Sequence, residues 1–483
     1  MEMIRTFISF ILVLNTILAI VTVFKEKRDI AATWAWLIVL IMMPIFGFVI
    51  YIFIGRKISK DKLFDIQTQE NIGLSRLIKA QKKLLKEHEL FQNYYQSENE
   101  ISEMVNMFLK SSDAVLTQGN EVDLIVDGKD KFEKLIKDIS KAKHHIHVTY
   151  YIYRNDEIGR KLLAALEERA KNGVEVLVIY DPLGSHQLRK SFFEQLRAYG
   201  GKAEPFFDST YKIINIRINY RNHRKMVIID GKTGYTGGFN VGDDYLGKYP
   251  KMGYWRDTHL RIRGNGVMPL QTRFLMDWNA SVKEYSLQYS PHYFPIMRNK
   301  GNVALQVVSS GPDSEIYGIK KGFLKMIMMA RKSILIQTPY FVPDESVIEA
   351  LQIALLSGIK VKLMIPNKPD HFFIYRATLY YASELVDYGA EVYIYDAGFL
   401  HAKTIVVDSE VSSVGTANFD IRSFKLNFEV NVFMYDKTIA HSLSEQFDED
   451  TKVSYLLTPE IINNFSEWEK FKQKFSRLFS PML

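Results

Sequence analysis

The chain has 483 residues, of which 47% are hydrophobic and 24% charged, so it can fold as two domains or one large symmetric one, and wholesale disorder is excluded. It contains no cysteine, which excludes disulfides, thiolate catalysis and cysteine-bound zinc. Its net charge of +7, from 62 basic and 55 acidic residues, fits an anionic partner, either nucleic acid or an acidic membrane surface, without selecting one.

Two apolar segments open the chain. Residues 4–24 carry one charge, Arg5, and residues 30–54 carry none. Each segment can cross a hydrocarbon core of about 30 Å at about 1.5 Å per helical residue. The connection at 25–29 is short, so we expect a transmembrane hairpin over residues 1–57, made of two helices at about 4–24 and 30–54.

Two other interpretations of these segments are weaker. A cleaved signal peptide is disfavoured because the first apolar core is too long and a second one follows at once. Two buried core helices are disfavoured because neither segment has a polar face. Basic residues flank the hairpin on both sides, with a modest excess outside its loop, and this favours a cytoplasmic location for the rest of the chain at a bacterial cell membrane.

A helical, charged connector is expected over residues 58–118, and strands then alternate with helices in the same order twice. We place the first half at 119–300 and the second at 301–483. The expected elements are helix 131–143, strand 145–153, helix 164–173, strand 174–182, segment 193–206 and strand 223–230, then helix 321–332, strand 334–341, helix 351–358, strand 359–366, segment 384–395 and strand 401–408. This alternation predicts an α/β fold with largely parallel strands, whose two similar α/β/α halves pack about a pseudo-twofold axis.

The sequences HRKMVIID (223–230) and HAKTIVVD (401–408) end this pattern in each half, and both are followed by a glycine and an asparagine at equal spacing. Two copies of H-x-K-x4-D-x6-G-x2-N on matching strands make a purely structural role improbable. The candidate site residues are His223, Lys225, Asp230, Gly237 and Asn240, with His401, Lys403, Asp408, Gly415 and Asn418 in the second copy.

Alternation along a strand places each histidine on the face of its lysine and the motif aspartate on the other face. We therefore expect Asp230 and Asp408 to be structural, tying turns or helix ends at the base of the site. Better candidates to orient the imidazoles are Asp257 and Glu429, which follow His223 and His401, respectively, on the next strand. Gly237 and Gly238 are expected to let the backbone approach a ligand closely.

Lysine ammonium and asparagine amide groups bind anions, and imidazole can act as a nucleophile or as a general acid and base. One histidine can attack phosphorus while the other, on the opposite side, protonates the leaving alcohol. A twofold axis through the phosphate supplies this in-line geometry, and two lysines neutralise the anion without a metal or other cofactor.

The paired motif resembles that of the phospholipase D superfamily, and the hairpin with its W…P-x-x-G…Y-x-x-x-G pattern from Trp36 to Gly55 resembles that of bacterial cardiolipin synthases. The resemblance covers essentially the whole chain. It implies that two phosphatidylglycerol molecules give cardiolipin and glycerol through a phosphohistidine, with the two His, Lys and Asp sets as the active site. By analogy, His223 is the nucleophile. Where a serine is common in the superfamily, this chain has Thr416 and Gly238, so a hydroxyl contact is expected in one half only.

The motifs alone do not separate transfer from hydrolysis, so a membrane-bound hydrolase and a non-catalytic lipid-binding scaffold stay open as alternatives. The expected partners are phosphatidylglycerol, cardiolipin and other anionic lipids; nucleic acid is not expected, and an oligomer is possible. The aromatic stretch 372–381 is expected either to line a lipid path or to belong to the core. The basic amphipathic helix at 465–479 is expected either to rest on acidic lipid or to pack on the domain.

Overall fold

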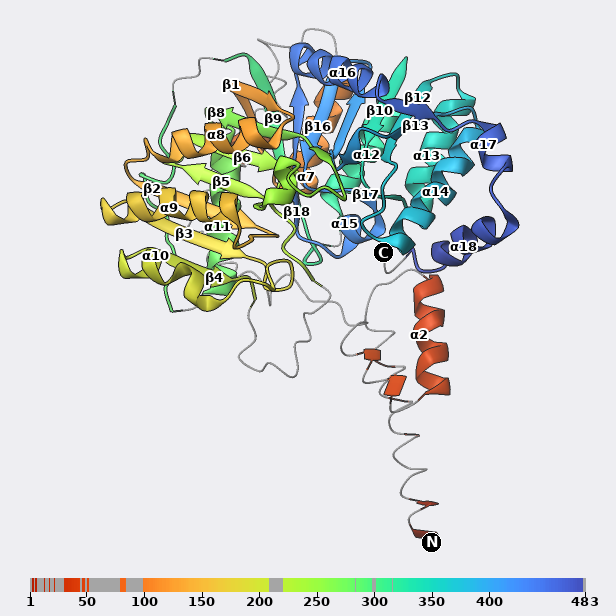
Figure 1. Ribbon diagram of the computed structural model, residues 1–483, viewed down its shortest axis with the longest axis horizontal. Coiled ribbons are helices and arrows are strands. Elements are labelled where there is room, and N and C mark those ends of the chain that lie inside the picture. Colours follow the sequence, from red (N-terminus) through yellow and green to blue (C-terminus); the bar gives the residue numbers. More distant parts are fainter. Residues whose placement is uncertain are drawn as a thin grey trace.

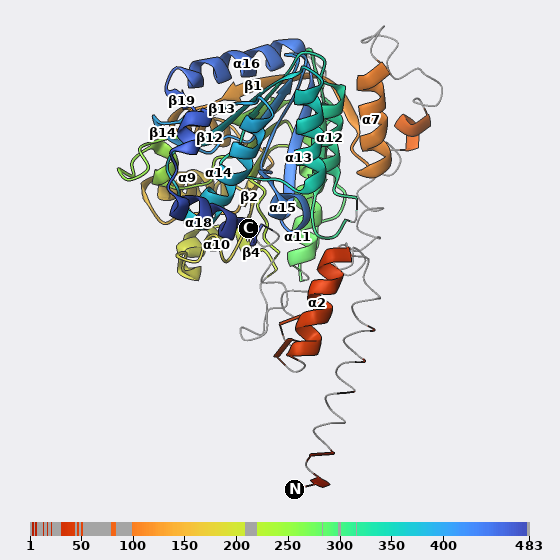
Figure 2. The same ribbon diagram turned by 90° about the vertical axis from the view of Figure 1, so that its right-hand side faces the viewer.

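The computed structural model describes residues 30–43, 79–83, 99–207, 220–282, 284–297, 301–314 and 316–480, with a few single residues and residue pairs before position 52. These residues form an α/β body, and α2 (Ile30–Met42) extends away from it in both views (Figure 1, Figure 2).

A single 15-stranded sheet runs through both halves of the body. Its centre is the antiparallel pair of β1 and β9, and the strand order read outward from β1 matches that read outward from β9, except that β19 adds one edge strand to the second half. The first half contributes β1 (Leu116–Ile125), β8 (His259–Arg263), β6 (Thr233–Gly237), β5 (Met226–Ile229), β2 (His145–Tyr150), β3 (Glu175–Tyr180) and β4 (Lys202–Pro205) in this order. The second half contributes β9 (Val303–Ser310), β18 (Glu429–Tyr435), β16 (Val411–Gly415), β15 (Thr404–Val407), β10 (Ser333–Gln337), β12 (Lys360–Pro366), β13 (Glu391–Tyr395) and β19 (Ser454–Leu456).

The expectation of largely parallel strands is wrong. Among the strands that the structure describes in this sheet, β2, β3 and β4 pair in parallel, as do their counterparts β10, β12 and β13. The other described pairings within this sheet are antiparallel. The reason lies in the motif strands, because β5 and β15 each turn directly back into a partner strand, and a tight hairpin can join only antiparallel strands.

Helices cover both faces of the sheet. One face carries α8 (Gly128–Ile139), α9 (Glu157–Lys171) and α10 (Glu194–Ala198) in the first half, with α7 (Asn99–Ser111), α12 (Gly318–Met329), α13 (Glu345–Leu356) and α14 (Phe372–Asp387) in the second. The other face carries α11 (Val267–Ser281) and α16 (Lys437–Thr451), whose apolar side chains share one core cluster across the two halves. The stretch 372–381 is thus part of a surface helix, α14. The shorter α15 (Ile421–Lys425), α17 (Pro459–Asn463) and α18 (Glu467–Arg477) complete the second half.

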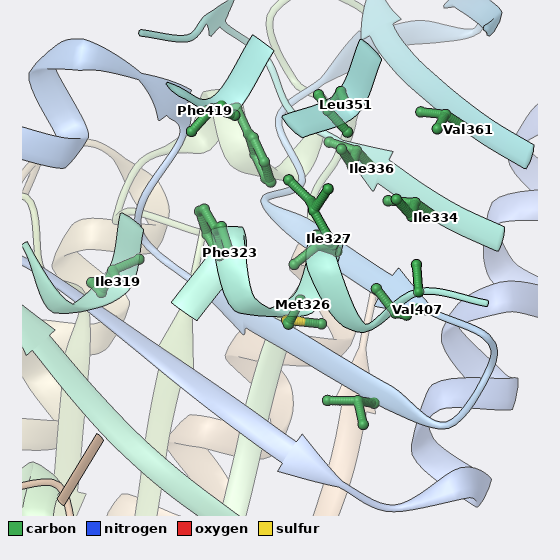
Figure 3. Close-up of a cluster of buried hydrophobic side chains, with 14 of the residues drawn as sticks. Ile319, Phe323, Met326, Ile327, Ile334, Ile336, Leu351, Val361, Val407 and Phe419 are labelled. Carbon is green, nitrogen blue, oxygen red and sulfur yellow. The ribbon is translucent and has the colours of Figure 1, made fainter. Parts of the chain in front are cut away.

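Apolar periodicity explains why these helices dock. In the second half, α12 directs Ile319, Phe323, Met326 and Ile327 onto the sheet, where they meet side chains such as Ile334 (Figure 3). The 3.6-residue period of the helix places these four positions on one face. Core packing of this kind fixes the strands, and therefore the segments at their ends, from which the site is built.

The predicted hairpin lies mostly outside the described residues. Its second segment contains α2, which carries no charged residue and exposes Ile30, Trp34 and Met42. Along the part of the chain that the structure describes, no helix combines the length and the apolar character needed to cross a membrane. The connector includes a short helical stretch at 79–83 and α7, which joins the core of the second half.

Candidate active site

The two histidines lie just before β5 and β15, next to the carboxyl ends of β2 and β10. The expected strands 223–230 and 401–408 are shorter than predicted, because β5 begins at Met226 and β15 at Thr404, so the histidine and lysine of each motif precede the strand. Met226 of β5 is paired with Thr149, and Thr404 of β15 with Gln337, so His223 and His401 precede equivalent positions in the sheet. Both imidazoles line one cleft of about 450 Å³, together with Asn240. The sheet symmetry therefore brings the two motifs, far apart in sequence, to a single site.

Each histidine is hydrogen-bonded to a carboxylate from the opposite half. His223 Nδ1 lies 2.9 and 3.0 Å from the two carboxylate oxygens of Glu429. His401 Nδ1 lies 2.5 Å from Asp257 Oδ2. The expectation that these carboxylates orient the histidines of their own half is wrong, since the pairs are exchanged between the halves.

Backbone pairing between the halves explains the exchange. The short strands β7 (Tyr254–Arg256) and β14 (Gly398–Leu400) pair in parallel, so the segment before His401 runs beside the segment before Asp257. His401 N then donates to Arg256 O at 2.7 Å, and the counterpart bond joins His223 N to Phe428 O at 3.0 Å. In both cases the histidine binds the residue just before its carboxylate partner.

The histidines are largely buried, with 12% of the His223 side chain and 10% of the His401 side chain exposed. Burial lowers the pKa of His223 to about 4 and that of His401 to about 3, so both imidazoles are neutral at pH 7 in the free protein. A neutral imidazole whose Nδ1 is bound to a carboxylate presents Nε2 as an unprotonated nitrogen, which suits a nucleophile or a base.

The two motif lysines lie behind the histidines, where each ammonium donates to the backbone oxygen of its own motif histidine, Lys225 at 2.6 Å and Lys403 at 2.5 Å. Burial lowers the pKa of Lys403 to about 8. Burial also lowers the pKa of Lys225 well below its usual range, and the charge of Lys403 adds to this effect. The two cations therefore act on one another, and an anion bound between them would be stabilised.

Glu429 remains ionised in this buried setting. Burial alone would raise its pKa, but His223 and Lys225 outweigh that effect and the pKa is lowered. Its oxygens also accept from Thr416 Oγ1 at 2.5 Å and from Asn427 Nδ2 at 3.2 Å. Thr416 thus supplies the hydroxyl that was expected in only one of the two halves, and this hydroxyl contacts Glu429, the carboxylate bound to His223.

Glycine takes the place of this threonine in the first half for a steric reason. A Cβ added to Gly238 would lie 1.9 Å from Asp257 Oδ1, so the carboxylate fills the space of the missing side chain. A Cβ on Gly237 would meet backbone atoms of Thr258 and His259, and one on Gly415 would meet Asn431. The idea that Gly237 and Gly238 admit a ligand is wrong, because protein atoms occupy the space beside them.

The motif aspartates lie away from the cleft and bind backbone. The Asp230 carboxylate accepts from the N–H groups of residues 143–145 at 2.8–3.1 Å, at the entry to β2. Asp408 accepts from the N–H groups of residues 331–333 at 2.7–2.8 Å, at the entry to β10. Neither carboxylate has a described contact with a motif histidine, and both residues adopt a positive φ at their hairpin turn.

The two asparagines line the cleft and are held at its wall. Asn240 Oδ1 accepts from Ile152 N at 3.0 Å, and Asn418 Nδ2 donates to Asp420 at 2.9 Å. The buried Oδ1 of Asn418 has no hydrogen-bond partner among the residues described. Asn418 itself lines the cleft, and this oxygen keeps an acceptor capacity that none of the described residues uses.

Sequence reasoning did not single out several cleft residues. Tyr151 packs edge-on to His223 with ring centroids 4.9 Å apart, and Trp255 lies 5.2 Å from the His401 ring. Other lining residues are Arg154, Arg221, Tyr245, Lys251, Tyr340, His371 and Arg422. For Tyr151, Arg154 and Tyr340, the sequence signal is their position in two stretches at the ends of β2 and β10, YYIYRND (150–156) and QTPYFVPD (337–344).

Comparisons with known proteins agree with this architecture. A family model described as "Cardiolipin synthase, PLD-like domain" matches residues 135–249 and 323–451, and one described as "Phospholipase D-nuclease N-terminal" matches residues 13–56. Among solved structures, a phosphatidylserine synthase of Haemophilus influenzae is similar in fold, with a TM-score of 0.57 and 15% identity over 75% of this chain and 95% of that one.

Curated relatives cover nearly the full length. The major cardiolipin synthase of Bacillus subtilis is 54% identical over 99% of this chain and 98% of its own. A cardiolipin synthase of Listeria innocua is 52% identical, covering 98% of each chain. The chain therefore belongs to the cardiolipin synthase family, with the phospholipase D-like fold in its α/β body.

Proposed function

We propose that this enzyme transfers a phosphatidyl group from one phosphatidylglycerol to the glycerol hydroxyl of a second, releasing cardiolipin and glycerol. The observation that carries the proposal is a single cleft with two neutral imidazoles, each oriented by a carboxylate from the other half, backed by two buried lysines. The names of its relatives support the same reaction.

The proposed mechanism has two displacements at one phosphorus. In the first, Nε2 of one histidine forms a bond to phosphorus, the bond from phosphorus to the glycerol oxygen breaks, and the other histidine gives that oxygen a proton. In the second, the same acid–base histidine removes a proton from the acceptor hydroxyl, whose oxygen forms a bond to phosphorus while the phosphorus–Nε2 bond breaks and frees the nucleophilic histidine. We assign the nucleophile to His223 and the acid–base role to His401 by analogy with the superfamily.

The supporting residues then have distinct roles. Lys225 and Lys403 neutralise the phosphate, while Asp257 and Glu429 fix the tautomers of the histidines and stabilise the imidazolium that forms. Asn240 and Asn418 bind the lipid headgroup, and Asn418 Oδ1 is available to accept from a glycerol hydroxyl. Asp230 and Asp408 stabilise the backbone at the entries to β2 and β10. The acid–base histidine must bind a proton before it can protonate the leaving oxygen, and the negative charge of the bound lipid favours that protonated form.

We also propose that residues 1–57 anchor the enzyme as two membrane spans, with the α/β body on the cytoplasmic side. The match of the N-terminal family model to residues 13–56 and the absence of charged residues from α2 support this arrangement. Because the chain lacks cysteine, single cysteines placed at 27 and 171 can be labelled in intact cells and in inverted vesicles to test it.

Product analysis tests the reaction. The full chain, purified in detergent, is given phosphatidylglycerol, and lipids and free glycerol are quantified. Cardiolipin and glycerol in equal amounts are expected. Phosphatidic acid without cardiolipin would contradict the proposal in favour of hydrolysis, and lipid binding without turnover would contradict it in favour of a scaffold.

A further inference from the structure

The C-terminal helix α18 is docked with its polar side inward. Gln473 and Ser476 are its buried residues, and Arg477 donates to Tyr380 of α14 at 2.9 Å. Arg376 of α14 lies 3.4 Å from Glu469. Hydrogen bonds and ion pairs therefore attach this helix to the body, whereas a surface helix ordinarily buries its apolar stripe.

The apolar stripe of α18 faces outward as an aromatic row. Trp468, Phe471, Phe475 and Leu478 are 65%, 54%, 44% and 73% exposed, at the spacing that shares one helical face. The rings are in contact along the row: centroids are 5.4 Å apart from Trp468 to Phe471, 6.2 Å from Phe471 to Phe475, and 5.3 Å from Phe475 to Phe479. Exposed rings arranged contiguously in this way are typical of an interaction surface.

The row continues onto the first turn of α14 and reaches the rim of the cleft. Phe372 and Phe373 are 65% and 51% exposed, and the Phe373 ring lies 6.1 Å from that of Phe479. The neighbouring residues His371 and Ile374 line the cleft that holds both motif histidines. One turn of α14 thus joins the apolar surface to the site of chemistry.

The charge and position of this surface select its partner. The sequence of α18 carries four basic side chains, Lys470, Lys472, Lys474 and Arg477, against two acidic ones, so the helix has a net positive charge beside its aromatic row. Both views place α18 at the end of the body from which the apolar α2 extends (Figure 1, Figure 2). Aromatic rings flanked by cations are the combination that binds an anionic bilayer at its interface.

We propose that α18 and the first turn of α14 form a membrane-contact ridge, made of Phe372, Phe373, Trp468, Phe471, Phe475, Leu478 and Phe479, which inserts into the interface of an anionic phospholipid bilayer. The ridge sets the cleft rim against the bilayer surface, so a lipid headgroup can enter the cleft while its acyl chains stay in an apolar environment. This placement goes beyond the proposed reaction and does not require it.

Site-specific fluorescence tests the ridge on the full chain. The absence of cysteine allows Phe471→Cys and Phe475→Cys to be labelled singly with an environment-sensitive dye, and Met328→Cys, at a residue of α12 that is 74% exposed, is the matched control. The proteins are reconstituted in vesicles of phosphatidylcholine with a minority of phosphatidylglycerol. We expect blue-shifted emission at 471 and 475, quenching by nitroxide-labelled acyl chains, and protection from aqueous iodide, with none of these at 328.

Two results would contradict the proposal of a membrane-contact ridge. Labels at 471 and 475 that are as accessible to iodide as the label at 328 would show that this face stays in water. A shift that follows protein concentration instead of lipid would assign the face to a second copy of the chain. Protein thermal stability is measured in parallel, and these exposed positions are expected to tolerate the change.

Discussion

At the scale of single residues, we propose that the carboxylates of Asp257 and Glu429 orient the histidines for chemistry. Each occupies Nδ1 of a histidine, which leaves Nε2 directed to chemistry. Asp257→Asn and Glu429→Gln keep the shape but favour the wrong tautomer, so kcat is expected to fall by about two to four orders of magnitude. Steady-state cardiolipin synthesis measures this, with circular dichroism as the control for folding. Activity within a factor of a few of the parent would contradict the assignment.

For Asp230 we predict the opposite effect, a loss of stability with little loss of activity in the folded protein. Its carboxylate binds three backbone N–H groups and no motif histidine among the described contacts. Asp230→Asn is therefore expected to lower the free energy of unfolding by roughly 1–3 kcal/mol while the folded fraction keeps most of its activity. Denaturant unfolding and activity per folded molecule measure the two effects. Lost chemistry at unchanged stability would make Asp230 a catalytic residue instead.

The lowered pKa of Lys403 predicts that substrate affinity depends on pH. Since the pKa of Lys403 is about 8 in the free protein, its ammonium loses a proton as the pH rises through that value, and the KM for phosphatidylglycerol should increase there. Lys403→Met should raise KM at neutral pH and flatten this rise, whereas the exposed Lys452→Met should change neither. A KM that is constant from pH 7 to about 9 would contradict the role of the lysine.

The lowered pKa of Lys403 affects folding in the opposite direction: as the pH rises, substrate affinity is expected to fall while the stability of the fold increases. Between about 8 and the usual 10.5, the unfolded chain holds a proton that folded Lys403 does not. The contribution of this lysine to the free energy of unfolding therefore rises with pH in that window.

Much of the site follows from the sequence, but its pairings do not. Face alternation separated the histidines and lysines from Asp230 and Asp408, and it pointed to Asp257 and Glu429. The exchange of these carboxylates between the halves depends on the pairing of β7 with β14, which lie far apart in the chain. A local pattern carries no information about which distant backbone a segment will join.

At the scale of secondary-structure elements, the end of β6 is shaped around a carboxylate. A Cβ at residue 238 would lie 1.9 Å from Asp257 Oδ1, so Gly238→Ala should displace the partner of His401 and lower kcat nearly as far as Asp257→Asn does. Thr416→Ala, at the equivalent place beside Glu429, removes the hydrogen bond to that carboxylate and the contacts of the same hydroxyl with the backbone of Val430, but it adds no atoms and should cost roughly tenfold or less. Equal effects of the two variants on kcat would contradict this steric account.

Most elements were predictable because their hydrophobic periods are strong. The motif strands, the helices around 131–143 and 321–332, and the strands 174–182 and 359–366 all appear near the expected positions. The parallel arrangement was overestimated, since the alternation of helices and strands dominates the pattern while short hairpins after Asp230 and Asp408 reverse the chain. For α18, the sequence gives amphipathicity, but which face turns outward depends on the polar contacts that α14 offers.

At the scale of the whole molecule, duplication gives one site instead of two. The sheet order is symmetric about β1 and β9, and each half supplies a histidine, a lysine and the carboxylate for the other half's histidine. The repeat was evident from sequence, and it implied that the halves meet at one phosphate. On the proposed mechanism, neither half can carry out the reaction alone.

The most direct test of this account compares cardiolipin formation by His223→Asn, His401→Asn and the double variant, all purified as full chains. Because the two histidines act as a unit, we predict that each single variant loses nearly all activity, on the order of 10⁴-fold or more, and that the double variant is no worse. If each single variant kept about half of the parental rate and only the double variant were inactive, the two motifs would be independent sites, and the central claim would be wrong.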